Sequence, residues 1–186
     1  MMNRREALSR VAIIMGGTVL GAEAFLSGCK TASTGISFSA ADISFLDEVA
    51  ETILPATNTP GAKEAKVGEF MKVMVTDCYE EKDQQIFSEG LNKIDTASKS
   101  KYSKSFIEVT PEERTALFNE INKELKTYNE QKKEGDPNHY FAMMKQLTLL
   151  GYFTSEIGAT QALRYVAVPG KYEGCIPYKK GDRAWA

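Results

Sequence analysis

The sequence predicts an all-α fold, a single bundle of about five helices followed by an irregular tail rich in Gly, Pro and Tyr. Apolar residues recur at spacings of three and four through most of residues 39–157, which is the period of a helix face. Two segments begin with strong helix-capping signals, and no segment alternates as a strand would. A net charge of −2 gives no electrostatic reason to bind nucleic acid.

Residues 1–28 have the pattern of an export leader that is removed from the mature protein. Arg4, Arg5 and Arg10 precede a stretch that is apolar but diluted by glycine. It is less hydrophobic than the roughly 20 strongly apolar residues of a membrane-spanning helix. Arg4 and Arg5 resemble the twin-arginine export signal in part, because Ala7 stands where that signal commonly has Phe.

A cysteine follows the leader in a distinctive setting. The stretch Leu26-Ser27-Gly28-Cys29 resembles the bacterial lipobox, in which the cysteine is acylated and becomes the new N-terminus. Lipid on Cys29 would hold the protein at a membrane surface, with residues 29–38 as a Ser- and Thr-containing tether. The alternative is an ordinary signal peptide with a chance cysteine. The sequence therefore predicts a helical domain at 39–186 and a periplasmic, lipid-anchored location.

The first helix is predicted from residue 39 to the residue before Pro55. Ser39 supplies an N-cap hydroxyl, and Asp42 supplies the carboxylate of a capping box. The acidic side chains Asp47, Glu48 and Glu51 are expected on its solvated face. Its apolar face consists of Ile43, Leu46, Val49, Ala50, Ile53 and Leu54. A turn cluster over residues 57–61 follows.

Two further helices are predicted between this turn and residue 96. The second has an apolar row made of Val67, Phe70, Met71, Met74 and Cys78. The third has an apolar row made of Ile86, Phe87, Leu91 and Ile94. Gly90 interrupts the third row, and the polar segment 96–105 is expected to end the helix.

The fourth helix has the clearest start in the chain. Thr110 is an N-cap residue, Pro111 fits the first turn, and two glutamates favour the positive end of the helix dipole. Its buried stripe contains Leu117, Phe118, Ile121, Leu125 and Tyr128. A fifth helix begins near Asn138 and runs towards Ile157 through Phe141, Met144, Leu147, Leu150 and Phe153. Residues 166–186 are expected to lack regular structure.

Catalytic chemistry is sparse in this chain. The single histidine, His139, sits at a helix start, where a surface or capping role is more common than a catalytic one. No C-x-x-C pair or Gly-rich phosphate loop is present in the sequence, so we assign no catalytic, cofactor-binding or metal-binding residue. Cys78 and Cys175 could form a disulfide in an exported protein, or remain two independent thiols.

Three stretches, taken in order, resemble the gluconate 2-dehydrogenase subunit 3 family. They are Thr52-Ile-Leu-Pro-Ala-Thr-Asn-Thr-Pro-Gly-Ala62, Leu147-Thr-Leu-Leu-Gly-Tyr-Phe-Thr-Ser-Glu156 and Pro169-Gly-Lys-Tyr-Glu-Gly-Cys-Ile-Pro177. The resemblance implies a small accessory subunit that escorts a large flavin-dependent sugar or sugar-acid dehydrogenase of the glucose-methanol-choline type. It also implies that FAD and the catalytic base belong to the large subunit, with no cofactor in this chain.

The aromatic residues themselves indicate where such a partner would bind. Tyr152 follows a glycine that allows close approach, and the tail adds Tyr172, Tyr178 and Trp185. Aromatic residues are enriched at the centres of protein interfaces. These four residues are therefore the predicted partner-binding residues, although Tyr152 and its neighbour Phe153 could instead fill the core.

Three functions remain open on the sequence alone. The first is the accessory subunit of a dehydrogenase complex, which aids export, maturation and membrane attachment of its partner. The second is a stand-alone ligand-binding or structural surface lipoprotein. The third is an enzyme that acts by itself, which would require activity from this chain without an added flavoprotein.

Overall fold

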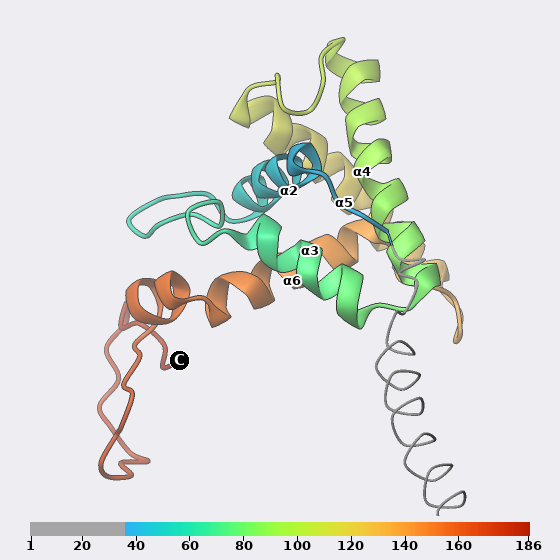
Figure 1. Ribbon diagram of the computed structural model, residues 1–186. Coiled ribbons are helices and arrows are strands. Elements are labelled where there is room, and N and C mark those ends of the chain that lie inside the picture. The colour runs from blue at the N-terminus through green and yellow to red at the C-terminus, as the bar shows by residue number, and fades with distance from the viewer. Residues whose placement is uncertain (1–35) are drawn as a thin grey trace, which may run out of the picture. The chain divides into compact units, whose positions relative to one another are not determined.

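The computed structural model describes residues 36–186 and confirms the all-α prediction. Its elements are α2 (Ala40–Ile53), α3 (Val67–Cys78), α4 (Glu81–Tyr102), α5 (Pro111–Gln131), α6 (Tyr140–Thr154) and the short π-helix η1 (Gly158–Ala162) (Figure 1). Within residues 36–186 the only β-type pairing is an isolated bridge between Arg164 and Trp185. No helix of this part of the chain is long and apolar enough to span a membrane. The predicted export and lipidation residues, Arg4, Arg5 and Cys29, lie outside the described residues.

Capping boxes fix the starts of α2 and α5. The sequence predicted the box of Ser39 and the N-cap role of Thr110, and the structure adds the box between Thr110 and Glu113. The Ser39 backbone N–H donates to the Asp42 carboxylate at 2.8 Å, and Ser39 Oγ accepts from the Asp42 N–H at 3.2 Å. Thr110 and Glu113 make the equivalent pair of bonds at 2.9 and 3.3 Å. Each box satisfies N–H groups that the first helical turn leaves without a partner.

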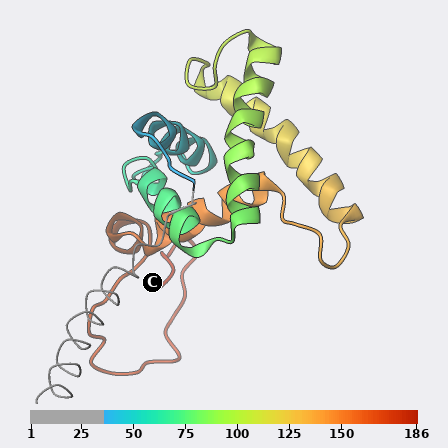
Figure 2. The same cartoon turned by 45° about the vertical axis from the view of Figure 1, so that its right-hand side comes forward.

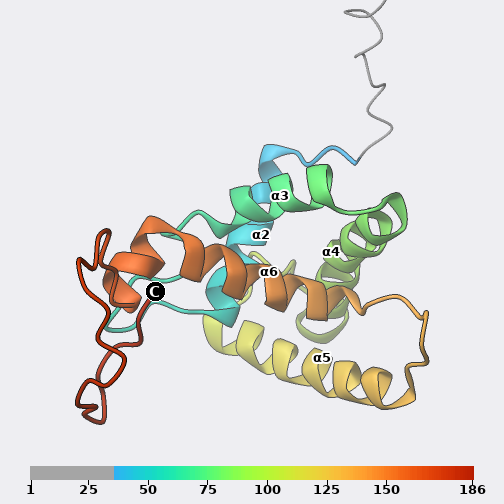
Figure 3. The same cartoon turned by 90° about the horizontal axis from the view of Figure 1, so that it is seen from below.

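Helix α6 is the central element of the bundle. It packs against α2, α3, α4 and α5, and Figure 3 shows it running between α3 and α5. His139 caps its start, because the imidazole Nδ1 accepts the Phe141 N–H at 3.2 Å. The helix is buried on much of its circumference, at Tyr140, Phe141, Met143, Met144, Leu147, Thr148, Gly151 and Tyr152.

A row of aromatic rings forms the centre of the core. Phe106 has ring-centroid distances of 5.1 Å to Phe45 and 5.2 Å to Phe118. Phe118 in turn contacts Phe141 of α6 at 5.0 Å. Phe106 is fully buried, although it lies in the irregular link between α4 and α5, seen where the two helices join in Figure 2. No periodic pattern in the sequence marked this residue as core.

The structure corrects the predicted end of the third helix, because α4 continues to Tyr102. Ser98 is buried and its Oγ donates to the Lys104 carbonyl at 3.1 Å, while Lys99 pairs with Asp95 one turn earlier at 2.6 Å. Gly90 does not interrupt the helix. A Cβ at Gly90 would lie 2.6 Å from the ring of Tyr140, so glycine permits the close packing of α4 on α6.

Two other expectations need correction. The predicted tether extends too far, because Phe38 is buried in the core and Ile36 packs against it. Cys78 is exposed and is not part of the core, although it follows Val75 by three residues and Met71 by seven and so lies on the same face of α3. It is the last residue of the helix, beyond the buried residues Val67, Met71 and Val75. Cys78 and Cys175 are both free thiols and both exposed, so the structure does not contain the disulfide, which stays a prediction.

Candidate functional site

Carboxylates of α2 shape the loop at residues 55–66, which contains most of the first resemblance stretch. Glu51 accepts the backbone N–H groups of Ala56 and Lys63, both at 2.9 Å. Asp47 accepts the N–H of Gly68 at 2.9 Å, in the first turn of α3. These side chains are therefore not a solvated face, as the sequence suggested. They bind backbone donors that the loop and the helix start would otherwise leave unpaired.

Glu48 is the third of these carboxylates and links the loop to α5. It pairs with both Lys63 and Arg114, and its side chain is only 18% exposed. Arg114 also donates through Nε to the Phe106 carbonyl at 3.0 Å and through Nη2 to the Ile107 carbonyl at 2.6 Å. Burial raises the pKa of Glu48, but the hydrogen bonds from Lys63 and Arg114 outweigh it and hold that pKa below its usual range. These contacts join α2 to the loop at 55–66 and to the start of α5.

Tyr152 joins the first two resemblance stretches. Its hydroxyl donates to the Pro60 carbonyl at 2.7 Å, and the residue is only 1% exposed. The prediction that Tyr152 binds a partner is therefore wrong, because no surface of this side chain is available. Its neighbour Phe153 is 39% exposed instead, which reverses the expectation that Phe153 faces the core.

The first two resemblance stretches meet at one end of the bundle, and the third lies in the tail that leaves the bundle from the same end. Figures 1 and 3 both show the loop at 55–66 beside the C-terminal part of α6 and η1, and the tail leaves the bundle from η1. We define the motif end as loop 55–66, residues 147–164 and the tail at 165–186. The first two stretches, which are far apart in the sequence, are thus in direct contact.

Exposed apolar side chains concentrate at the motif end. Among the described residues, all but two of the exposed large apolar side chains lie within residues 149–185; the exceptions are Val73 and Ile107. Tyr172 is 96% exposed, Tyr178 79% and Trp185 55%. The remaining members are Leu149, Leu150, Phe153, Tyr165, Val166, Val168 and Ile176. An apolar concentration of this kind is typical of an interaction surface.

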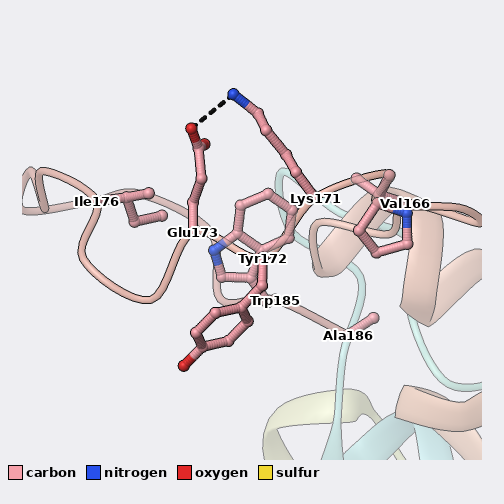
Figure 4. Close-up of a pocket in the computed structure, with 8 residues that line it drawn as sticks. Val166, Lys171, Tyr172, Glu173, Ile176, Trp185 and Ala186 are labelled. Carbon is pink, nitrogen blue, oxygen red and sulfur yellow. Dashed lines mark ion pairs between the residues drawn. The ribbon is translucent and has the colours of Figure 1, made fainter.

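The tail has no helix or strand, as predicted, yet it lines a cavity of about 410 Å³ that is open to solvent on one side. Figure 4 shows the rings of Tyr172 and Trp185 at this cavity, with the ion pair between Lys171 and Glu173 to one side. The pair is 2.6 Å long and both side chains are solvent-exposed. Val166, Pro169 and Ile176 also line the cavity. The cavity thus has an apolar lining with charged groups at its edge.

Two observations concern the polar groups elsewhere in the described residues. His139 is held as a helix cap, and burial lowers the pKa of its imidazole. Within residues 36–186, no three His, Cys, Asp or Glu side chains are grouped to hold a metal ion. The motif end, with its exposed aromatic tail, is therefore the candidate functional site.

Comparison with known proteins gives the same family as the sequence resemblance. No curated protein and no solved structure matches the chain. The family model for gluconate 2-dehydrogenase subunit 3 matches residues 40–170, which covers every helix of the bundle and the start of the tail. The chain therefore belongs to the gluconate 2-dehydrogenase subunit 3 family, whose members are small subunits of a dehydrogenase complex.

Proposed function

We propose that this protein is a non-catalytic accessory subunit that binds the large, FAD-containing subunit of its complex through the motif end. The partner is a sugar or sugar-acid dehydrogenase of the glucose-methanol-choline type. The observation that carries this proposal is the concentration of exposed aromatic and aliphatic side chains within residues 149–185. Family membership supplies the partner class, because a small subunit of a dehydrogenase complex must contact another subunit.

The exposed tail fits an interface better than it fits a free surface. Tyr172, Tyr178 and Trp185 place large apolar area in water, which is unfavourable by about 25 cal/mol per Å² of apolar surface. Tyr and Trp are also the residue types that contribute most at interface centres. A partner that covered these rings would remove that area from water. The bundle itself does not cover them.

The N-terminal sequence supports a second part of the proposal, which concerns export and attachment. Arg4 and Arg5 resemble a signal for a route that passes folded proteins, and a flavoprotein loaded with FAD in the cytoplasm must travel folded. By binding the flavoprotein first, the small subunit would provide it with an export signal. Lipid on Cys29 would then hold the complex at the membrane, in the periplasm.

Export of the partner gives the most direct test of this function. We would replace Arg4 and Arg5 together by Lys in the native bacterium and locate the dehydrogenase by its activity and bound flavin in cytoplasmic and periplasmic fractions. The proposal expects both proteins to remain in the cytoplasm. Replacement of Cys29 by Ala serves as the matched control, since it should release the exported complex from the membrane without blocking export.

Normal export of the dehydrogenase in the Arg4→Lys/Arg5→Lys strain would contradict the escort role. A tagged chain that purified from the native membrane without any flavin-containing dehydrogenase would instead favour a stand-alone lipoprotein. Dehydrogenase activity from this chain alone would favour the third reading, an independent enzyme.

A further inference from the structure

The end of the chain returns to the bundle after the long exposed loop at residues 165–182. The Arg164 N–H donates to the Ala184 carbonyl at 2.7 Å, and the Ala186 N–H donates to the Arg164 carbonyl at 3.2 Å. These two bonds form the parallel bridge between Arg164 and Trp185. The loop therefore leaves and re-enters the bundle at the same place. Its length exceeds the roughly 12–15 residues beyond which irregular loops are usually functional or disordered.

Two arginine side chains strengthen this closure. Arg183 Nη1 donates to the Gln161 carbonyl at 2.8 Å and to the Thr160 carbonyl at 3.4 Å. Both carbonyls belong to η1, and a cation is favourable at the negative, C-terminal end of a helix. The Arg164 guanidinium lies 4.8 Å from the centroid of the Trp185 ring, within cation–π range. Arg183, near the end of the chain, thus contacts η1, and Arg164, just after η1, contacts Trp185 near the end of the chain.

We propose that residues 183–186 act as a clasp that closes loop 165–182 and holds it ready for the large subunit. The docking half of this inference rests on the proposed function, whereas the closure itself does not. A loop with both ends fixed has lost much of its chain entropy before binding. The partner then binds side chains that are already positioned, and preorganisation of this kind increases affinity.

The closed loop also indicates which kind of surface it fits. Val166, Pro169 and Ile176 line the cavity of about 410 Å³ together with the rings of Tyr172 and Trp185 (Figure 4). The charged pair of Lys171 and Glu173 lies at its edge. A complementary surface on the large subunit would be apolar at its centre, with an apolar side chain that enters the cavity and polar groups around it.

Trp185 provides a direct signal for the clasp, because it is the only tryptophan of the chain. We would measure its fluorescence anisotropy in the isolated chain and in the double variant Arg164→Ala/Arg183→Ala. We expect the anisotropy to fall towards that of a free peptide with the sequence of residues 177–186. Tyr178→Ala is the matched control: Tyr178 lies in the loop and outside the clasp, so the anisotropy should not change.

The same variants would then be tested for binding to the flavin-containing large subunit. Opening the clasp should weaken binding by roughly tenfold or more, because several aromatic side chains must be ordered on binding. Tyr178→Ala should weaken binding without changing the anisotropy. The two measurements thus separate closure of the loop from docking.

Each remaining outcome bears on one half of the inference. Wild-type anisotropy as low as that of the peptide, and unchanged in the double variant, would show that no clasp exists. Lower anisotropy with unchanged binding would show that the clasp does not prepare the loop for the partner. If the wild-type chain bound no large subunit, the docking half would fall together with the proposed function, while the anisotropy result would still decide the closure.

Discussion

The pair of helices α4 and α5 and the motif end differ in how they present apolar residues. Between residues 81 and 131, Ile107 is the single exposed large apolar side chain. The outer surfaces of α4 and α5 instead have ion pairs, such as Lys99 with Asp95 and Lys101 with Glu120. At the motif end the aromatic side chains of the tail face water.

This difference separates the part of the chain that stabilises the fold from the part that is available for binding. The apolar residues of α4 and α5 are covered by the chain itself and contribute to the free energy of folding. Those of the tail are not covered, so their removal should change binding far more than stability. Substitutions in α4 and α5 should therefore lower the free energy of unfolding, whereas substitutions in the tail should weaken complex formation.

The largest effect on stability is expected from Phe106→Ala. Phe106 is fully buried between Phe45 and Phe118, and truncation of a buried Phe costs about 3–5 kcal/mol. Ile107→Ala is the matched control, because this neighbour is 46% exposed and its truncation should cost far less. Urea unfolding followed by circular dichroism measures both. Equal losses in the two variants would show that the aromatic row is not the centre of the core.

A smaller loss of folding stability is expected from Tyr152→Phe, which removes the hydrogen bond between the first and second resemblance stretches. The Pro60 carbonyl would lose the donor that now lies 2.7 Å away, at a cost of about 1–2 kcal/mol. Tyr165→Phe removes a hydroxyl from a residue that is 56% exposed and should not change the free energy of unfolding. If Tyr152→Phe were equally neutral, this bond would not hold loop 55–66 in place.

How far the sequence predicted the fold depended on whether a residue's role was local. The capping box of Ser39 and the N-cap Thr110 were predicted correctly, because each signal lies within a few neighbouring residues. Asp47 and Glu51 were misplaced on a solvated face, because they bind backbone N–H groups that come later in the chain. Glu51 binds the loop at 55–66, and Asp47 binds the first turn of α3. Phe106 was missed because an irregular segment gives no periodic signal.

The candidate site was predicted in part for the same reason. Tyr172, Tyr178 and Trp185 were recognisable as aromatic residues in a segment unsuited to a helix, and the structure leaves all three exposed. Tyr152 and Phe153 were assigned the wrong way round, since neighbours on a helix point about 100° apart and periodicity alone leaves the phase uncertain. The clasp could not be predicted, because it depends on long-range contacts of Arg164 and Arg183.

The smallest change in folding stability is expected from His139→Asn and should depend on pH. Burial lowers the pKa of His139, Glu124 opposes that shift and Lys93 adds to it. The neutral imidazole therefore stabilises the fold above the ordinary histidine pKa of about 6.5, and this contribution is lost as the pH falls through the lowered value. Asn is a preferred N-cap residue but does not titrate in this range.

Urea unfolding of wild type and His139→Asn at several pH values between 5 and 8 tests this prediction. The two proteins should be similar at pH 8, and the variant should gain stability relative to wild type as the pH falls. A constant difference across this range would mean that the cap does not depend on a neutral imidazole.

The central claim is that the exposed tail contributes to binding and not to folding. The most direct measurement compares Tyr172→Ala/Tyr178→Ala with Val73→Ala/Ile107→Ala, a pair of exposed apolar residues outside residues 149–185. Each variant would be assayed for its free energy of unfolding and for its affinity for the flavin-containing large subunit. We expect the tail variant to unfold like wild type, within about 0.5 kcal/mol, and to lose roughly thirtyfold or more in affinity. The control variant should keep wild-type affinity. A tail variant that unfolded more easily, or that bound as tightly as the control, would contradict the claim.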